Sequence, residues 1–204
     1  MNNFDIGDLI QTYDKYAEER NHAGLDGRKI SHITEAIQLF SDNGVRSILE
    51  IGSGPGNAAQ LFFDKGFEIE CADVSPNMID LVRAKGIIGH VIDCRDIKKI
   101  GMTYDGVFSV NCLLHLPKAE MVGALKAIHS TLKTNGLFLL GLWGGEDFEG
   151  IWEQDRYRPA RFFMLYSQHT LLSLLTKVFQ IEEYRRIAFG EGLFFHNLVL
   201  RKSF

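Results

Sequence analysis

Short apolar runs alternate with amphipathic stretches along most of the chain, a pattern that predicts strands and helices in turn. Helical spacing is clear at about 8–20, and again where Ile30, Ile33, Ile37 and Phe40 mark one face. The expected buried strands are, in order, "RSILEI", "FEIECADV", "IIGHVID", "YDGVFSVN" and "LFLLGLW". Because these five strands alternate with helices, we expect a parallel sheet with right-handed crossovers.

The C-terminal part of the chain breaks this alternation. Residues 143–166 show no clear period, and the helical segment "SQHTLLSLLTKVF" follows them. The segments "IEEYRRIAF" and "LFFHNLVLR", joined by "GEG", predict a closing antiparallel hairpin. Residues 1–204 therefore predict one α/β domain, with a seven-stranded, mostly parallel sheet and an antiparallel C-terminal strand.

Composition narrows the classes of function. A balance of 22 basic against 26 acidic residues argues against a nucleic-acid partner, because binding phosphates requires a basic face. The chain shows no secretory leader and no apolar run of the roughly 20 residues that cross a membrane, so we expect a cytoplasmic protein without membrane contact. Cys71, Cys94 and Cys112 lack C-x-x-C spacing, which predicts reduced, buried thiols. No metal is expected, because the histidines other than His115 lack ligand-like spacing and are interpreted as isolated surface or edge residues.

The segment "LEIGSGPGN", at 49–57, contains the first candidate chemistry. Gly52, Gly54 and Gly56 follow a predicted strand and precede a predicted helix, the position of many nucleotide-binding loops. Their G-x-G-x-G spacing differs from the G-x-G-x-x-G of dinucleotide-binding folds. Asp73 ends the next predicted strand, 21 positions after Gly52, where a carboxylate can accept hydrogen bonds from both ribose hydroxyls.

Several ordered motifs together carry a resemblance to a known family. They are "ILEIGSGPGNAAQLF", "CADVSPNMIDLVRAK", "VIDCRDI", "YDGVFSVNCLLHL" and "LKTNGLFLLGLW". Over roughly residues 30–202 the chain resembles the class I S-adenosylmethionine-dependent methyltransferases, most closely their small-molecule branch. The resemblance implies the Rossmann-like methyltransferase fold with helices on both faces of the sheet. It also implies S-adenosyl-L-methionine as cofactor, an N-terminal helical flap at about 1–28 and a lid insertion at about 143–166.

The resemblance also implies a set of cofactor-binding residues. Glu50 would anchor the methionine end, Asp73 the ribose and Asp93 the adenine amino group, while Asn111 would offer its backbone carbonyl to the methionine ammonium. The glycines would let the backbone approach the cofactor. The full set is Glu50, Gly52, Ser53, Gly54, Gly56, Asp73, Val74, Asp93, Cys94 and Asn111.

Four side chains are candidates for the acceptor side. His115 follows the fourth strand and is the candidate general base, with the alternative that it caps or orients the loop before Pro117. Tyr13 and Tyr16 could cover the cofactor, as N-terminal helices of the family do, or pack their helix on the core. Trp143 could line the acceptor pocket or cover the sheet edge.

The segment "GGEDFEGIWEQDRYRPARFFMLYS" interleaves arginines with aromatic residues. One hypothesis is a substrate lid whose arginines bind an anionic acceptor, because a guanidinium matches carboxylate or phosphate with two parallel hydrogen bonds. Arg161 is the candidate, because it borders the aromatic cluster. The alternative is a surface insertion with local ion pairs between its acids and arginines.

The leading hypothesis is methyl transfer from S-adenosylmethionine to a small-molecule acceptor. A non-catalytic module that binds the cofactor or a partner on the same fold is the alternative. An aminopropyl transferase is disfavoured because no acidic pair follows the fourth strand. A nicotinamide oxidoreductase is disfavoured by the glycine spacing and the closing hairpin. "NCLLH" stands where enzymes that methylate nucleic-acid bases have "NPPY". The acceptor, the atom methylated, and the choice between monomer and homodimer stay open.

Overall fold

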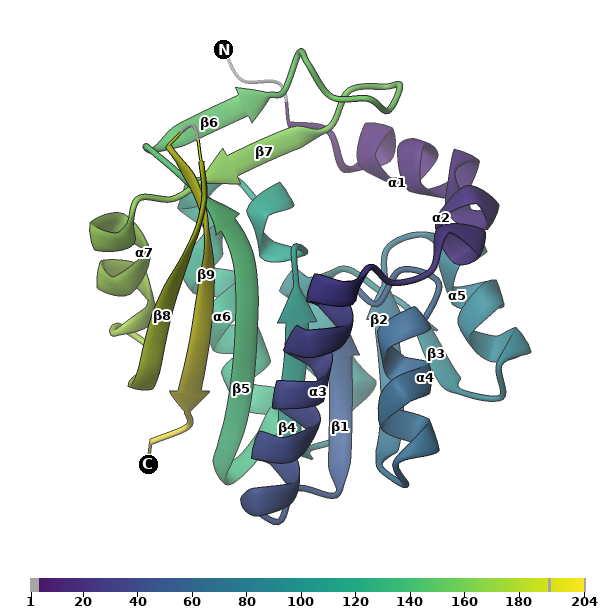
Figure 1. Cartoon of the computed structure of the whole chain (residues 1–204), viewed down its shortest axis with the longest axis vertical. Helices are drawn as coiled ribbons and strands as arrows, with labels where there is room; N and C mark the ends of the chain where they lie inside the picture. The colour runs from purple at the N-terminus through teal and green to yellow at the C-terminus, as the bar shows by residue number, and fades with distance from the viewer. Residues whose placement is uncertain (1–3, 191, 204) are drawn as a thin grey trace.

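A seven-stranded sheet runs through the middle of the computed structural model, which describes residues 4–190 and 192–203 (Figure 1). The strand order is β3-β2-β1-β4-β5-β9-β8, and β9 runs antiparallel to both of its neighbours. This confirms the predicted sheet. The strands are β1 Ser47–Ile51, β2 Glu68–Asp73, β3 Ile88–Val91, β4 Tyr104–Val110, β5 Leu132–Gly144, β8 Gln180–Gly190 and β9 Leu193–Arg201.

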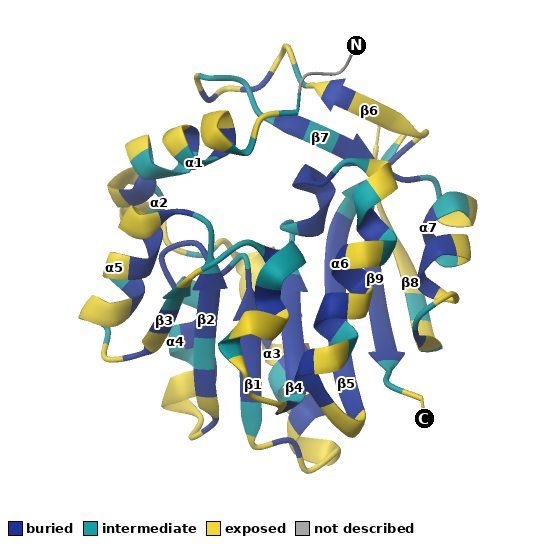
Figure 2. Ribbon diagram, turned by 180° about the vertical axis from the view of Figure 1, so that it is seen from behind, coloured by how far each residue is buried: buried dark blue, intermediate teal, exposed yellow. Residues whose placement is uncertain are grey.

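Helices cover both faces of this sheet, as predicted. Successive strand residues point to opposite faces, so Ile48 packs in the core beneath α3, α4 and α5, whereas Leu49 packs in the core beneath α6 and α7. Figure 2 shows the central strands mostly buried between these layers. The helices are α1 Ile6–Lys15, α2 Ala17–Ala23, α3 Gly27–Asp42, α4 Asn57–Asp64, α5 Pro76–Ala84, α6 Lys118–Thr131 and α7 Gln168–Leu175, with 3₁₀ helices at Cys94–Ile100 and Leu113–His115.

The helical segment expected at 8–20 is two helices rather than one. The backbone leaves helical angles at Tyr16, with φ −105° and ψ 15°, and α2 begins at the next residue. Both helices contact α5, so the break lets each of them pack against it. In α3, Ile33 and Phe40 are buried as expected, but Ile30 is 45% exposed because the first turn of this helix extends beyond the core. Met1 to Asn3 of the predicted flap lie outside the described residues.

The segment without a clear period, 143–166, forms a small sheet of its own. Its strands β6 Phe148–Ile151 and β7 Phe162–Leu165 pair antiparallel and lie above the carboxyl ends of the parallel strands (Figure 1). Helices α1 and α2 lie at the same end of the molecule. Glu191, in the predicted "GEG" turn, lies outside the described residues. None of the helices in the described ranges combines the length and apolar character that a bilayer crossing requires.

One histidine interpretation is wrong. His196 was expected at the surface or an edge, but it is fully buried in β9. Its Nε2 lies 2.9 Å from the Tyr166 carbonyl and its Nδ1 lies 3.1 Å from the Tyr184 hydroxyl, so both ring nitrogens have partners. Gly144 makes this burial possible, because a Cβ there would lie 2.2 Å from His196 Nε2.

Candidate active site

A cavity of about 880 Å³ lies at the carboxyl ends of the parallel strands, beneath α1, α2 and the sheet formed by β6 and β7. This small sheet lies in the predicted lid segment and is called the lid sheet below. Its size is near the upper end of the roughly 300–1,000 Å³ that small-molecule sites span. All of the predicted cofactor residues line it except Gly56, which forms the turn into α4. Of the predicted acceptor residues, Tyr13, His115, Trp143 and Arg161 line it and Tyr16 does not.

The glycine loop needs its glycines for different reasons. All three have left-handed backbone angles, with φ of 72° at Gly52, 54° at Gly54 and 78° at Gly56. A Cβ on Gly52 would lie 2.3 Å from the Cβ of Cys112, so the loop and the turn after β4 touch there. A Cβ on Gly54 would meet nothing within 4 Å, so its backbone faces open space in the cavity.

Two acids lie beside this loop, Glu50 buried and Asp73 half-buried. Asp73, at the end of β2, accepts hydrogen bonds from the backbone N–H of Gly54 at 2.9 Å and of Ser75 at 3.0 Å. Burial raises the pKa of Asp73, and these bonds oppose the rise. Burial and the neighbouring Asp73 charge raise the pKa of Glu50 to about 8. Among the described residues, Glu50 Oε2 is buried without a hydrogen-bond partner, as expected of a carboxylate that a cationic ligand completes.

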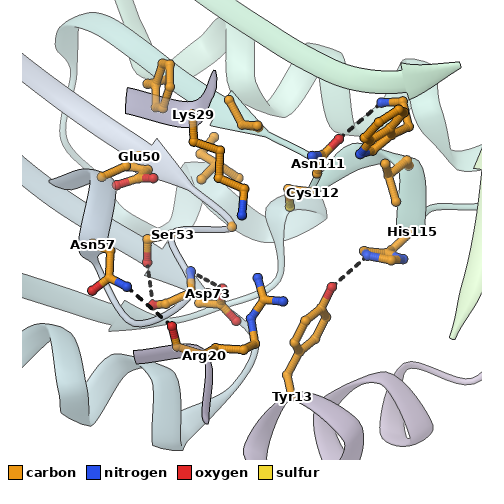
Figure 3. Close-up of a pocket in the computed structure, with 18 of the residues that line it drawn as sticks. Tyr13, Arg20, Lys29, Glu50, Ser53, Asn57, Asp73, Asn111, Cys112 and His115 are labelled. Carbon is orange, nitrogen blue, oxygen red and sulfur yellow. Dashed lines mark hydrogen bonds between the residues drawn. The ribbon is translucent and has the colours of Figure 1, made fainter. Parts of the chain in front are cut away.

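Sequence reasoning missed a basic residue in the cavity. Arg20 in α2 points its guanidinium toward the space between Asp73 and Tyr13 (Figure 3). Its Nη1 donates to the Tyr157 hydroxyl at 3.3 Å, while its buried Nε has no partner within the described ranges. Arg20 lies seven positions after Tyr13, a spacing that places residues on one helical face and could have indicated it.

Asp93 and its neighbours line the far end of the cavity. Arg95 donates from Nε to Asp93 Oδ1 at 2.9 Å and from Nη2 to Oδ2 at 2.5 Å, and it also binds Glu120. Burial disfavours the ionised form, but the bonds and charge of Arg95 hold the pKa of Asp93 below its usual value. A carboxylate has about four lone-pair positions, so this pairing leaves Asp93 able to accept from a ligand.

Asn111 joins the ends of two strands. It has the left-handed angle φ 55°, and its side-chain Oδ1 accepts from the backbone N–H of Trp143 at 3.1 Å (Figure 3). The Trp143 ring lies 4.5 Å from that of Phe189, between ring centroids. Both the end of β4 and the end of β5 are thereby fixed at the cavity wall.

A hydrogen-bond network crosses the acceptor side of the cavity. His115 Nδ1 lies 2.7 Å from the Phe162 carbonyl, so this nitrogen carries the proton and donates it. Nε2 therefore accepts from the Tyr13 hydroxyl, also at 2.7 Å (Figure 3). Burial first, and then the charges of Arg161 and Arg20, lower the pKa of His115 to about 3, although the Phe162 carbonyl opposes this. The imidazole is neutral near pH 7.

Arg161 completes this network from the lid. Its Nη1 donates to the Tyr13 hydroxyl at 3.0 Å, and its Nε and Nη2 bind both oxygens of Asp155 at 2.7 and 2.9 Å. Arg161 therefore forms the local ion pair that the alternative expected and also lines the cavity, and its binding of an anionic acceptor stays a prediction. Burial raises the pKa of the Tyr13 phenol, opposed by the nearby arginine charges. Tyr16 instead packs on Tyr157 of the lid, with ring centroids 4.5 Å apart.

No group of three or more His, Cys, Asp and Glu side chains in the described parts of the chain is arranged to hold a metal ion. The expectation of a metal-free site stays a prediction. Cys71, Cys94 and Cys112 are free thiols; the first two are buried, and Cys112 is half-buried beside Gly52.

Comparison with known families identifies the class of this protein. Residues 16–185 match the methyltransferase domain family, so the chain belongs to that family. The resemblance found in its motifs is confirmed. Comparison with curated proteins gives no significant match.

Many solved structures share the fold. The 1,6-didemethyltoxoflavin-N1-methyltransferase of Burkholderia thailandensis, with that compound and S-adenosylhomocysteine bound, is 18% identical with a TM-score of 0.65 over 92% of this chain and 87% of that one. The N-methyltransferase NodS of Bradyrhizobium japonicum, in complex with S-adenosylhomocysteine, is 14% identical with a TM-score of 0.72 over 96% and 98%. The magnesium protoporphyrin IX methyltransferase of Synechocystis, with S-adenosylmethionine bound, is 14% identical with a TM-score of 0.69 over 96% and 95%.

Proposed function

We propose that this methyltransferase-family protein transfers the methyl group of S-adenosylmethionine to a small-molecule acceptor. The observation that carries the proposal is the pair of acids, buried Glu50 and half-buried Asp73, beside a glycine loop that faces open cavity. Glu50 is buried with a free oxygen, which suits a ligand that brings an ammonium group. The methyltransferases of similar fold that hold S-adenosylmethionine or S-adenosylhomocysteine support the choice of cofactor.

The residues of the cavity fit the parts of this cofactor. Asp73 would accept from the ribose hydroxyls, and Asp93 from the adenine amino group beside Val74 and the Cys94 backbone. Glu50 would face the methionine ammonium, whose charge favours the ionised carboxylate. Arg20, with its free Nε, would bind the methionine carboxylate.

When bound, the cofactor supplies a methyl group on a positively charged sulfur. The contribution of this chain is then mainly alignment, since transfer requires the acceptor atom, methyl and sulfur to be nearly collinear. The walls near Trp143 and Phe163 are aromatic, and such an apolar lining would disfavour water beside the reacting atoms.

The contacts of His115 favour its orienting role over direct base catalysis. Its Nδ1 is used by the Phe162 carbonyl and its Nε2 by the Tyr13 hydroxyl, so neither nitrogen is free to reach an acceptor. Tyr13 is the polar group that faces the acceptor, and the hydroxyl keeps one lone pair after accepting from Arg161. As a base, His115 would instead take the acceptor proton through Tyr13.

The charge of the acceptor and the location of the protein are further parts of the proposal. Arg161 lines the cavity but is paired with Asp155, so an anionic acceptor would depend on other cations of the cavity wall, such as Arg156 and Lys29. Figure 3 shows the Lys29 side chain reaching into the cavity. A cytoplasmic location rests on the sequence alone.

Calorimetric titration with S-adenosylmethionine, S-adenosylhomocysteine and NAD tests the proposal. We expect micromolar binding of both sulfur compounds and none of NAD. A screen for methyl transfer then separates the enzyme from the non-catalytic alternative, in which the cofactor binds without turnover. Binding of NAD alone would contradict the proposal.

A further inference from the structure

A second, smaller cavity lies inside the lid. Its volume is about 270 Å³, room for roughly nine water-sized groups at about 30 Å³ each. It lies between the lid sheet, the loop 152–161 that joins β6 to β7, and the ends of β5 and β9. Its lining residues are Trp143, Trp152, Gln154, Asp155, Arg156, Arg161, Phe163, Leu165 and Leu193.

The lid cavity adjoins the large cavity along a shared wall. Trp143, Arg156, Arg161 and Phe163 line both of them. Arg161 in this wall is only 14% exposed and is held by its two bonds to Asp155. Its guanidinium also lies over the Phe163 ring, 5.0 Å from the centroid. One ligand could therefore extend around a fixed wall from the acceptor side of the large cavity into the lid.

The walls of the lid cavity indicate what it would hold. Trp152 and Phe163 lie edge to face with centroids 6.1 Å apart, and Leu165 and Leu193 add aliphatic surface. Such a lining favours flat aromatic groups, which bury large apolar area and prefer offset or edge contacts with other rings. Arg156 lies at the margin with an exposed side chain, and its Nη2 donates to the Tyr157 hydroxyl and lies 3.6 Å from Glu19. The guanidinium has five N–H donors, so its other N–H groups can bind an anionic substituent.

We propose that the lid cavity is a second subsite of the methyl acceptor, which binds a flat aromatic part of it that carries a negative charge. The reacting end would lie in the large cavity near Tyr13, and the aromatic part would pass Trp143 into the lid. This inference rests on the proposed function, because it takes the large cavity as the site of transfer.

A fluorescent probe of the same chemistry tests the subsite without knowledge of the acceptor. The probe is 8-anilinonaphthalene-1-sulfonate, an aromatic anion, added to protein saturated with S-adenosylhomocysteine. Trp143 and Trp152 are the two tryptophans of the chain and both line the lid cavity, so quenching of their emission follows binding. Leu193→Glu places a negative charge, of the same sign as the probe, at a half-buried position in the wall of the lid cavity. Ile151→Glu makes a matched control change on β6, outside the linings of both cavities.

We expect saturable binding to the wild type, weakened at least about tenfold by Leu193→Glu through like-charge repulsion and less than about twofold by Ile151→Glu. Equal affinity in the wild type and Leu193→Glu would overturn the subsite. So would binding of the probe to the ligand-free protein but not to protein saturated with S-adenosylhomocysteine, because that would place the probe in the cofactor region. Failure of S-adenosylhomocysteine itself to bind would instead reject the proposed function, so the two failures are told apart.

Discussion

At the scale of single residues, the site depends on a few groups whose charge is set by burial. Asp73 shows this most directly, because its carboxylate already orders the glycine loop through the Gly54 N–H. The same carboxylate is proposed to hold the ribose, so one side chain shapes the loop and binds the ligand. Burial and the charge of Asp73 raise the pKa of its neighbour Glu50 to about 8, although a backbone hydrogen bond from Ala59 opposes the rise.

Asp73→Asn should weaken binding of S-adenosylhomocysteine by about tenfold or more, on the order of 1.5–3 kcal/mol for hydrogen bonds to a charged group. Calorimetric titration measures the affinity. Asp64→Asn, the same change at an exposed position in α4, is the matched control and should leave the affinity within about twofold. An unchanged affinity in Asp73→Asn would remove Asp73 from the cofactor site.

Glu50 should make the ligand-free protein less stable as pH rises from about 5 to 8. Its pKa in the folded protein is about 8, above the value of 4.5 for an exposed glutamate, so the folded state holds the proton more tightly than the unfolded state. The free energy of unfolding therefore falls as pH rises through this window. Urea unfolding at several pH values should show that the free energy of unfolding falls more steeply with pH in the wild type than in Glu50→Gln. Parallel curves for the two proteins would contradict the raised pKa.

His115→Gln should lower turnover by about tenfold and leave the affinity for S-adenosylhomocysteine unchanged, because the side chain orients Tyr13 and does not touch the cofactor. Steady-state kinetics with an acceptor from the screen measures this. A loss of about 10²- to 10⁴-fold, the usual contribution of general acid–base catalysis, would favour the role of base instead. Tyr13→Phe is the companion variant, since it removes the hydroxyl that His115 orients.

At the scale of elements, the β1–α4 loop touches the turn after β4 at one glycine and borders the open cavity at another. Gly52 packs against Cys112, whereas Gly54 faces free space. The flap and the lid meet on the other side, where the Thr12 hydroxyl donates to the Pro159 carbonyl at 2.9 Å and Arg161 donates to Tyr13. The glycine loop, the turn after β4, the predicted flap and the predicted lid therefore each form one wall of the cavity.

Gly52→Ala and Gly54→Ala should separate folding from binding. Both residues have positive φ, so alanine costs about 1–2 kcal/mol at either position from backbone strain. Only at position 52 does the new Cβ also overlap Cys112, which adds about 1–3 kcal/mol for overpacking. Urea unfolding should therefore show the larger loss for Gly52→Ala. Gly54→Ala should stay folded and bind S-adenosylhomocysteine more weakly. Equal free energies of unfolding for Gly52→Ala and Gly54→Ala would contradict this account.

Local sequence patterns predicted the elements that depend on local rules. Ser75 and Pro76 begin α5 by the usual capping rules, with proline in the first turn and the Ser75 hydroxyl accepting from Met78 N–H. Contacts between distant segments were not predictable. The lid strands are four residues each, and neither the sequence FEGI of β6 nor FFML of β7 alternates apolar with polar residues. His196 is buried where Gly144 leaves room for its ring. Arg20 was missed because its role depends on where α2 lies over the sheet.

At the scale of the whole molecule, the parallel strands bring residues from distant positions to one edge. Glu50, Asp73 and Asn111 lie at or next to the carboxyl ends of three neighbouring strands, and the order β2-β1-β4 in the sheet places them together. This part of the site could be predicted, because the carboxyl ends of parallel strands form the ligand site of such sheets. The acceptor side could not, since it is built from the flap and lid, whose placement over that edge follows from side-chain contacts.

Because the proposed cofactor would contact several strand ends and the flap at once, its binding should stabilise the whole fold. A ligand that binds only the folded state, at a hundred times its Kd, adds about 2.7 kcal/mol to the free energy of unfolding. For a chain of 204 residues this corresponds to a rise in Tm of about 5–10 °C. Thermal unfolding followed by circular dichroism should show that rise with S-adenosylhomocysteine and none with NAD. In Asp73→Asn, at the same S-adenosylhomocysteine concentration, the rise should be about half as large or less, because a tenfold weaker affinity leaves the ligand at about ten times its Kd. A wild-type Tm that S-adenosylhomocysteine leaves unchanged would contradict the cofactor assignment.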